Sequence, residues 1–257
     1  MPDRTTAEKV DFSDNVVVVT GGAQGIGRAC CTAFAALGAD VAITDVAIDA
    51  AEETAANLES DHGVQAIAVQ TDVTEYDDAT AMVDTVVDEL GSVDVLVNNA
   101  GVGNGEPFVE QTPDDWKTQI DICQYGTLNC SHAVLREMMD QQSGVIINFA
   151  SDSYKGNDPG LSVYGAAKAA NVSFTSTLAQ EVGGEGIRVN CVSPGTTWTP
   201  ATEEWLEEYS EKVLESYALD RLGQPEDIAD TVVFLSSDAA DWVTGQVLSV
   251  NGGYIRT

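Results

Sequence analysis

The sequence predicts a doubly wound α/β fold, in which helices cover both faces of a parallel sheet of about seven strands. Short segments rich in valine and isoleucine alternate with longer amphipathic segments along the whole chain. Strands that are apolar on both faces need helices above and below them, and right-handed crossovers then place helices on both sides. No linker or break in composition divides residues 1–257, so we expect a single domain.

The first part of the chain predicts four strands and three helices. Residues 15–20 (NVVVVT) and 40–45 (DVAITD) have the β-branched runs that are typical of buried strands. A glycine-rich turn follows the first strand and leads into a helix. The other elements expected in this part are strands at 65–70 and 93–98, and helices at 25–37, 47–60 and 75–90.

The second part continues the alternation. Thr112 and Pro113 are a typical helix start, and we expect one long helix over 113–141. Residues 145–150 (VIINFA) are expected to form the fifth strand. The remaining elements are helices at 161–182 and 225–236, strands at 187–192 and 246–250, and an acidic segment at 201–217.

The charge of the chain is strongly unbalanced: 42 acidic residues stand against 11 basic ones, and the formal net charge is −31. So few cations argue against nucleic acid or an anionic membrane surface as a partner. The acidic side chains would repel one another at low ionic strength, whereas about 1 M salt shortens the Debye length to about 3 Å. We interpret this composition as halophilic adaptation to a salt-filled cytoplasm; the alternative is an ordinary acidic, highly soluble protein.

Cysteine and histidine usage predicts no metal site and no disulfide framework. The five cysteines are odd in number and none has C-x-x-C spacing, and the two histidines, His62 and His132, have no metal-binding spacing. The polar segment 1–15 lacks the apolar core of a signal peptide, and no apolar run is long enough to cross a membrane. We therefore expect a cytoplasmic protein.

The glycine-rich turn predicts a dinucleotide-binding domain. Residues 20–27 read TGGAQGIG and lie between the first strand and the first helix. Glycines let the backbone approach a pyrophosphate, and the helix N-terminus offers it free amides. Glycines can also close a tight turn without any ligand, but this position in the fold favours a nucleotide. The expected contacts are Gly21, Gln24, Gly25, Ile26 and Gly27.

Asp45, at the end of the second strand, predicts NAD rather than NADP as the cofactor. A carboxylate at this place accepts hydrogen bonds from both hydroxyls of an adenosine ribose and repels a 2′-phosphate. No lysine or arginine stands in the loop before Gly25 or directly after Asp45 to bind such a phosphate.

Together these features resemble the short-chain dehydrogenase/reductase family, and the resemblance covers nearly the whole chain. TGGAQGIG fits the family's TGxxxGxG pattern, and the run NNAG at 98–101 follows the fourth strand, as in the family. The resemblance implies a Rossmann fold and further contacts to the cofactor. These contacts are Asp72 and Val73 at the adenine, Asn99, Ala100 and Gly101 in the NNAG run, and Pro194, Gly195 and Thr199 at the nicotinamide carboxamide.

The resemblance also implies that Ser151, Tyr164 and Lys168 are catalytic. Tyr164 and Lys168 are four residues apart on an expected helix and share one face, and Ser151 follows the fifth strand. An ammonium about 4 Å from a phenol favours the phenolate by about 1–4 kcal/mol. We expect Tyr164 to transfer the proton, Ser151 to bind the substrate oxygen, and Lys168 to hold the nicotinamide ribose as well. The string YxxxK is common, but a chain with five lysines argues against coincidence.

One position departs from the family pattern. Counting from Trp116, with Gly126 in register, the family's asparagine on this helix falls on Cys123. In the family that asparagine distorts the helix, and its main-chain carbonyl binds a water that leads to the lysine. We expect a backbone contact to survive in this chain and the side-chain hydrogen bonds to be lost. No motif links a histidine to Cys123, so we expect a core thiol rather than a nucleophile.

The substrate pocket is expected between residues 103–107, 152–159 and 196–217, of which the last resembles the family's mobile substrate lid. Aromatic side chains in this lid favour an apolar or ring-shaped substrate, although they could merely pack the lid shut. Lys155 is a candidate contact for an anionic group. The aromatic residues are Trp198, Trp205, Tyr209 and Tyr217.

Three functions remain open from the sequence. The first is an NAD-dependent oxidoreductase acting on a secondary alcohol or ketone. A hydroxyacyl-CoA or an alicyclic alcohol is a candidate substrate, because residues 150–152 and 245–250 resemble the same segments of hydroxyacyl-CoA and alicyclic hydroxyacyl-CoA dehydrogenases. The second is a sugar or polyol dehydrogenase, and the third is a non-catalytic NAD-binding protein, which Cys123 leaves open. Glu185 argues against an acyl carrier protein as partner, because reductases of that partner often carry a base there. The resemblance further implies a homotetramer or homodimer formed through the helices at 113–141 and 161–182.

Overall fold

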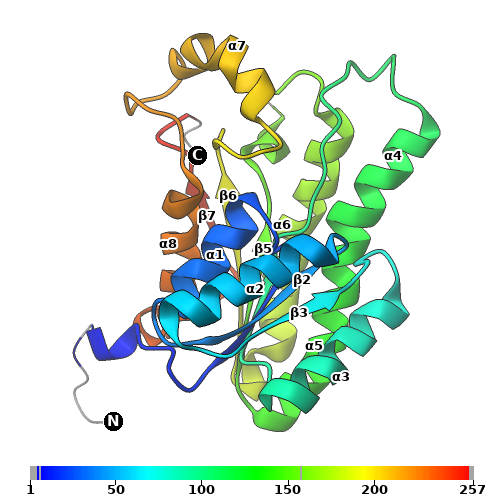
Figure 1. The fold of residues 1–257 in the computed structure, drawn as a ribbon. Helices are drawn as coiled ribbons and strands as arrows, with labels where there is room; N and C mark the ends of the chain where they lie inside the picture. Colours follow the sequence, from blue (N-terminus) through cyan, green and yellow to red (C-terminus); the bar gives the residue numbers. More distant parts are fainter. Residues whose placement is uncertain (1–4, 6, 157, 255–257) are drawn as a thin grey trace.

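The structure, a computed structural model, is built around one parallel sheet with helices on both of its faces (Figure 1). It describes residue 5 and residues 7–156 and 158–254. The sheet has seven strands in the order β3-β2-β1-β4-β5-β6-β7, and all neighbouring strands are parallel. The doubly wound fold predicted from the sequence is confirmed.

The strands lie close to their predicted positions. All five residues of β1 are buried, because this strand lies between β2 and β4 in the middle of the sheet. The strand predicted at 187–192 continues to Pro194, because the last strand pairs with it as far as Pro194 and Val250. The strands are β1 (Val16–Thr20), β2 (Asp40–Asp45), β3 (Ala66–Gln70), β4 (Val95–Asn98), β5 (Gly144–Phe149), β6 (Ile187–Pro194) and β7 (Val247–Val250).

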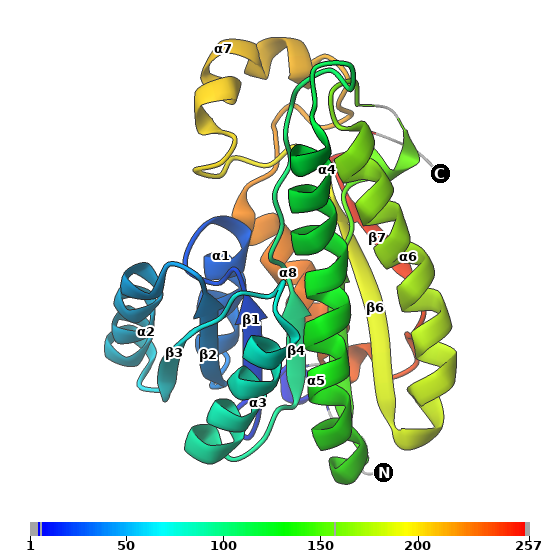
Figure 2. The same cartoon turned by 90° about the vertical axis from the view of Figure 1, so that its right-hand side faces the viewer.

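Alternate residues of each strand pack against opposite helix layers, as the strand period of two requires. Val17 and Val19 belong to a core shared with α1, α2 and α8, whereas Val16 and Val18 belong to a core shared with α3, α5 and α6 (Figure 2). The helices are α1 (Gly25–Ala35), α2 (Ile48–His62), α3 (Tyr76–Leu90), α4 (Pro113–Ile120), α5 (Gly126–Gln141), α6 (Ser162–Val182), α7 (Glu203–Leu214) and α8 (Pro225–Ser236).

The long helix predicted over 113–141 is interrupted. It starts as predicted, with the Thr112 hydroxyl accepting from Asp115 N and the Asp115 carboxylate accepting from Thr112 N. Residues Asp121–Tyr125, labelled η2, form a π-helical turn between α4 and α5. A π turn adds one residue to the helix and often marks a functional site. Cys123 lies at the centre of this turn.

The acidic segment predicted at 201–217 contains α7, which stands beyond the carboxyl ends of the strands and apart from the two main helix layers (Figure 1). Leu206 is its one fully buried residue, while Trp205 and Tyr209 are exposed and stacked on each other. Among the helices that the structure describes, none has the length and apolar character needed to cross a membrane.

All five cysteines are buried free thiols. Burial raises the pKa of Cys30 and of Cys130 to about 12 and the pKa of Cys191 to about 11, since a thiolate loses its hydration in an apolar interior. These cysteines therefore contribute to the core as small apolar side chains.

Candidate active site

The glycine-rich turn and the NNAG run are joined by hydrogen bonds at the carboxyl ends of β1 and β4. Asn99 Nδ2 donates to the carbonyls of Thr20 (2.9 Å) and Gly21 (3.0 Å). In return, the Thr20 hydroxyl accepts from the backbone N–H groups of Asn99 and Ala100. Asn99 thus holds the shape of the glycine-rich turn.

The geometry of this turn fits a pyrophosphate. A Cβ atom on Gly27 would lie 2.1 Å from the Gly21 carbonyl oxygen, and Gly21 itself has a φ of +63°. Gln24, the residue before α1, has extended backbone and makes no side-chain cap. The Gln24 side chain therefore does not cap the first backbone N–H groups of α1, at Gly25 and Ile26. These N–H groups can receive an anion.

Asp45 is fixed against the same turn. Its Oδ2 accepts from Ala23 N (3.1 Å) and its Oδ1 accepts from Ala47 N (3.0 Å). Each carboxylate oxygen keeps a further lone pair for a ribose hydroxyl. The structure therefore brings Asp45 and the glycine-rich turn together, as the sequence predicted.

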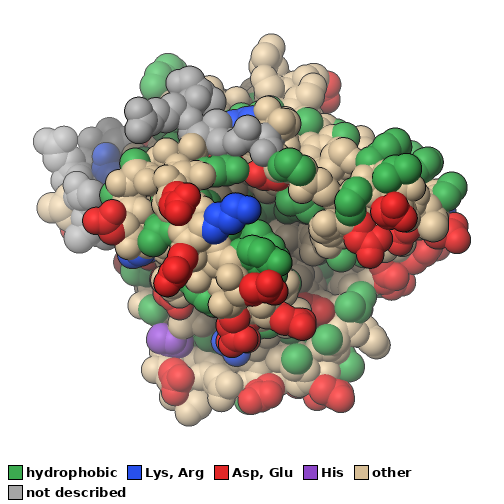
Figure 3. Space-filling model, turned by 90° about the horizontal axis from the view of Figure 1, so that it is seen from above, with side chains coloured by type: hydrophobic (Ala, Val, Ile, Leu, Met, Phe, Trp, Pro, Cys, Tyr) green, Lys and Arg blue, Asp and Glu red, His purple; other side chains and the backbone are tan. Residues whose placement is uncertain are grey.

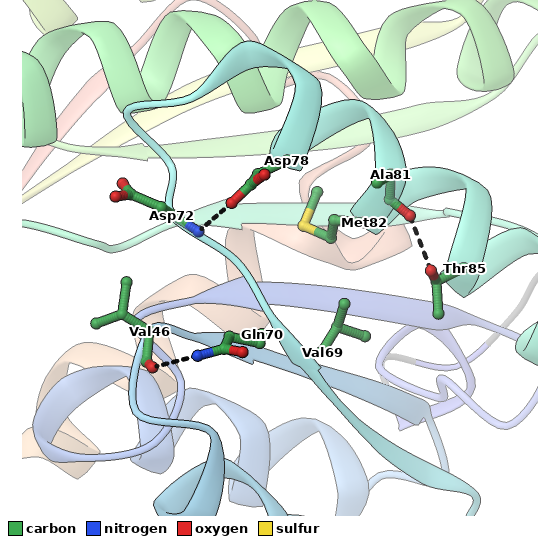
Figure 4. A pocket seen from close by; sticks show the side chains of 8 residues that line it. All are labelled: Val46, Val69, Gln70, Asp72, Asp78, Ala81, Met82 and Thr85. Carbon is green, nitrogen blue, oxygen red and sulfur yellow. Dashed lines mark hydrogen bonds between the residues drawn. The ribbon is translucent and has the colours of Figure 1, made fainter.

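Asp72 and Val73 follow β3, the strand at one edge of the sheet. The Asp72 carboxylate accepts from the backbone N–H and the hydroxyl of Thr74, at 3.0 and 2.7 Å. Val73 is buried, and its carbonyl accepts from Asn129 Nδ2. Asp72 also lines a pocket of about 510 Å³ together with Val46 of the β2 end and residues of β3 and α3 (Figure 4).

Ser151, Tyr164 and Lys168 come from the end of β5 and the first two turns of α6. Lys168 is only 2% exposed; its Nζ donates to the Phe149 carbonyl (3.1 Å) and lies 5.8 Å from the centre of the Tyr164 ring. Ser151 precedes a short 3-10 helix, η3 (Asp152–Lys155), and its hydroxyl accepts from Ser153 N.

Two backbone segments close around this group. A Cβ atom on Gly101 would lie 3.2 Å from Lys168 Nζ, and one on Gly103 would lie 3.5 Å from the Tyr164 ring. The NNAG run and the two residues after it therefore link the glycine-rich turn to Lys168 and Tyr164.

The segment after β6 reaches the same region. Gly195 N donates to the Val250 carbonyl (3.0 Å), which ties Pro194 and Gly195 to the end of β7. Thr199 lies 3.5 Å from the position of a Cβ atom on Gly25. The structure thus brings most of the sequence-predicted residues together at the carboxyl ends of the strands. Asp72 and Val73 lie after β3, the outermost strand on one side.

Cys123 makes side-chain hydrogen bonds of its own. Its Sγ accepts from Val102 N (3.4 Å) and donates to the Val102 carbonyl (3.3 Å). A thiol is a weak donor and acceptor, so these contacts are weaker than those of an amide. The Cys123 carbonyl accepts from Thr127 Oγ1 (3.1 Å) and Asn171 Nδ2 (2.9 Å), and its contact with a water that leads to the lysine stays a prediction.

Asn171 is a residue that the sequence analysis missed. Its Nδ2 also lies within hydrogen-bonding distance of the Phe149 carbonyl (3.2 Å), the same oxygen that accepts from Lys168. Asn171 is 1% exposed, and its Oδ1 has no hydrogen-bond partner among the described residues. A buried amide costs free energy unless it is paired, so an asparagine one turn after Lys168, on the helix face that also carries Tyr164, was the available signal.

Lys155 is not available as the anion contact that the sequence suggested. Its Nζ pairs with the buried Asp152 carboxylate (3.1 Å) and donates to Ser249 Oγ (2.9 Å). Asp152 further accepts from Ser193 Oγ (2.8 Å) and from Asn251 Nδ2. Lys155 therefore ties the loop after β5 to β6 and β7.

Acidic side chains surround the face on which this site opens. Figure 3 views the molecule from the side of α7, and Asp and Glu are scattered over that face, whereas Lys and Arg are few. Six glutamates and one lysine lie on α7 and the residue after it, at Glu203, Glu204, Glu207, Glu208, Glu211, Lys212 and Glu215.

The fold and the site define an oxidoreductase that uses a nicotinamide cofactor, and comparison with known proteins agrees. A family model described as Enoyl-(Acyl carrier protein) reductase matches residues 21–255. A 3-oxoacyl-[acyl-carrier-protein] reductase from Synechocystis sp. is 37% identical over 241 residues, covering 93% of this chain and 96% of the relative.

Solved structures agree as well. A short-chain type dehydrogenase/reductase from Mycobacterium marinum superposes with a TM-score of 0.94 at 31% identity, covering 98% of this chain and all of its own. A 7α-hydroxysteroid dehydrogenase complexed with NADH and 7-oxo glycochenodeoxycholic acid gives a TM-score of 0.93 at 32% identity, covering 99% of both chains. The chain belongs to the short-chain dehydrogenase/reductase family and acts on a hydroxyl or keto substrate.

We expect Asn171→Leu to lower kcat at least about tenfold, because the Phe149 and Cys123 carbonyls beside Lys168 lose their amide partner. Asn190→Leu is the matched control, since Asn190 is also a buried asparagine but donates to Val243 near the other end of β6. Both variants should lose melting temperature, and only Asn171→Leu should lose kcat. Equal kcat values in the two variants would show that Asn171 has no part in positioning Lys168.

Proposed function

We propose that this protein is an NAD-dependent dehydrogenase that transfers a hydride between NAD(H) and a secondary alcohol or ketone. The observation that carries the proposal is the convergence of Tyr164 and Lys168 with the segment from the NNAG run to Gly103, which is hydrogen-bonded to the glycine-rich turn. The uncapped start of α1, the Gly21–Gly27 contact and Asp45 together fit a bound dinucleotide.

In this proposal the residues of the chain bind and orient the substrate and the cofactor, and they move one proton. The nicotinamide supplies the hydride acceptor or donor when it is bound. Ser151 hydrogen-bonds the substrate oxygen, and Tyr164 Oη takes the hydroxyl proton in oxidation or returns it in reduction. The Lys168 ammonium stabilises negative charge on the Tyr164 oxygen and has donors left for the nicotinamide ribose, because the described structure shows one acceptor for it, the Phe149 carbonyl. The remaining proposed cofactor contacts are those assigned above from the sequence.

We infer an uncharged ring or acyl chain at the reacting end of the substrate, as in an alicyclic alcohol or a hydroxyacyl-CoA. The internal pairing of Lys155 with Asp152 and the glutamates of α7 support an uncharged group there. The segment 196–217 is the proposed substrate lid, because α7 stands beyond the strand ends and is anchored by Leu206. The similarity to 3-oxoacyl-[acyl-carrier-protein] reductases favours a 3-oxoacyl thioester as the second candidate.

We also propose a cytoplasmic homotetramer or homodimer formed through α4, α5 and α6. Tyr125 of η2 and Met139 of α5 support the oligomer, since both are large side chains with apolar surface exposed on these elements, at 54% and 43%.

Replacing the catalytic phenol tests the proposed chemistry. Tyr164→Phe should bind NADH as the unchanged protein does and lose kcat by a factor of about 10² to 10⁴, because the proton donor is absent. Turnover is followed by NADH absorbance with cyclohexanol, 3-hydroxybutyryl-CoA, cholic acid, glucose and ribitol, and with the matching ketones. Tyr76→Phe is the control, since Tyr76 is exposed on α3, which is not one of the helices of the proposed subunit interface. NADH binding without turnover on the whole panel would favour a non-catalytic protein, and turnover on glucose or ribitol alone would favour the sugar dehydrogenase.

The choice of NAD depends on Asp45. Asp45→Ser should improve NADPH binding relative to NADH at least about tenfold, because the carboxylate no longer repels a 2′-phosphate. Fluorescence titration of both cofactors measures the two Kd values. Asp49→Ser, in the first turn of α2, removes the same charge from a nearby exposed position and should leave the ratio unchanged. A wild-type protein that prefers NADPH would contradict the assignment.

Salt dependence tests the proposed halophilic adaptation. The melting temperature should rise between about 0.1 M and about 2 M KCl, because screening weakens repulsion among 42 acidic residues. Thermal melts monitored by circular dichroism measure it. A melting temperature that stays constant or falls would identify the protein as an ordinary acidic one.

A further inference from the structure

A chain of hydrogen bonds leads away from Ser151 to the C-terminal segment. Ser151 Oγ lies 3.2 Å from Ser153 Oγ, and Ser153 Oγ lies 2.6 Å from Asp158 Oδ2. The other oxygen of Asp158 accepts from the Tyr254 hydroxyl at 2.8 Å. Ser153 is only 7% exposed, so water competes little for these bonds.

The direction of each hydrogen bond follows from the chemistry of its ends. A carboxylate only accepts hydrogen bonds, so Ser153 donates its proton to Asp158. Ser153 Oγ can then only accept from Ser151, which donates its own proton in that direction. Ser151 Oγ also accepts from Ser153 N (3.3 Å). What Ser151 still offers to another group is a lone pair.

We propose that Ser153 and Asp158 are positioning residues that orient the Ser151 hydroxyl. They hold it as a hydrogen-bond acceptor in the resting site, and this favours the alcohol form of the substrate over the ketone form. The inference rests on the proposed function. An alcohol can donate its proton to the free lone pair of Ser151 when it binds, and this proton turns to Tyr164 before the hydride leaves. A ketone needs a donor and must draw the Ser151 proton away from Ser153.

The backbone around Ser153 is held in a way that keeps this arrangement rigid. A Cβ atom on Gly165 would lie 2.6 Å from the Ser153 carbonyl oxygen, so η3 packs directly on the turn of α6 that follows Tyr164. Ser153 is thereby fixed relative to Tyr164.

The far end of this series of hydrogen bonds, at Tyr254, reaches the base of the proposed lid. The ring of Tyr254 stacks on that of Tyr217, with centres 5.0 Å apart and planes at 14°. The Tyr217 hydroxyl accepts from Thr196 N (2.7 Å), at the start of the lid segment. The orientation of Ser151 is thus connected to the segment that would cover the substrate.

The first test needs no turnover. Thermal melts of Ser151→Ala, Ser153→Ala and the double variant form a double-mutant cycle. If the two hydroxyls are paired, the sum of the decreases in melting temperature of the two single variants should exceed the decrease in the double variant by about 2 °C. Additive losses would overturn the proposed chain, whether or not the enzyme turns over any compound on the panel.

The second test measures the preference itself, with the alcohol and ketone of the panel that react fastest. Inhibition constants are determined for the ketone bound with NAD⁺ and for the alcohol bound with NADH, neither of which can react. In Ser153→Ala and in the near-isosteric Asp158→Asn, the ratio of the two constants should shift towards the ketone by about fivefold, the equivalent of one neutral hydrogen bond. Ser249→Ala is the control, since Ser249 contacts Asp152 and Lys155 rather than Ser151.

The outcomes separate the two hypotheses. A merely structural role would raise both inhibition constants together and leave their ratio unchanged, which would overturn the inference even if the enzyme is active. A wild-type protein without turnover on the whole panel would overturn the proposed function, and the melting cycle would still decide whether Ser153 orients Ser151.

Discussion

The burial of one ammonium group determines how the candidate site is built. A charged lysine is costly to remove from water unless its donors find partners. Lys168 Nζ is placed against the Phe149 carbonyl, at the end of β5, and the same oxygen lies within reach of Asn171. Asn171 in turn contacts the Cys123 carbonyl, in the π turn that interrupts the long helix. The carboxyl end of β5, the interrupted helix and α6 are therefore connected around a single buried charge.

The scarcity of basic residues makes their placement informative. Lys155 pairs with Asp152 inside the fold, and Arg188 donates to the carbonyls of Leu235, Ser236 and Ser237 at the end of α8. Arg221 pairs with Asp227 at the start of the same helix. In a chain with 11 basic residues, several are thus used to join elements, and the acidic residues are left to dominate the surface.

Sequence reasoning was most successful where the backbone pattern is local. Runs of valine and isoleucine predicted all seven strands, because a strand buried on both faces must be apolar throughout. The π turn at Asp121–Tyr125 was not predicted from the apolar pattern, which was read as one helix, and only the family resemblance pointed to a distortion at Cys123. Lys155 was suggested as an anion contact because the sequence does not show that it pairs with the buried Asp152 and also contacts Ser249, 94 residues away in the chain. The roles of Asn171 and Ser153 also depend on contacts that the local sequence pattern does not show.

The burial of the five cysteines has a practical consequence for the chemistry of the whole molecule. With pKa values of about 11 to 12, Cys30, Cys130 and Cys191 stay protonated at neutral pH, and a protonated thiol is a poor nucleophile. Oxygen and alkylating reagents therefore react slowly with these thiols until the protein unfolds. The modification rate of these thiols reports on global unfolding, with no label or engineered probe required.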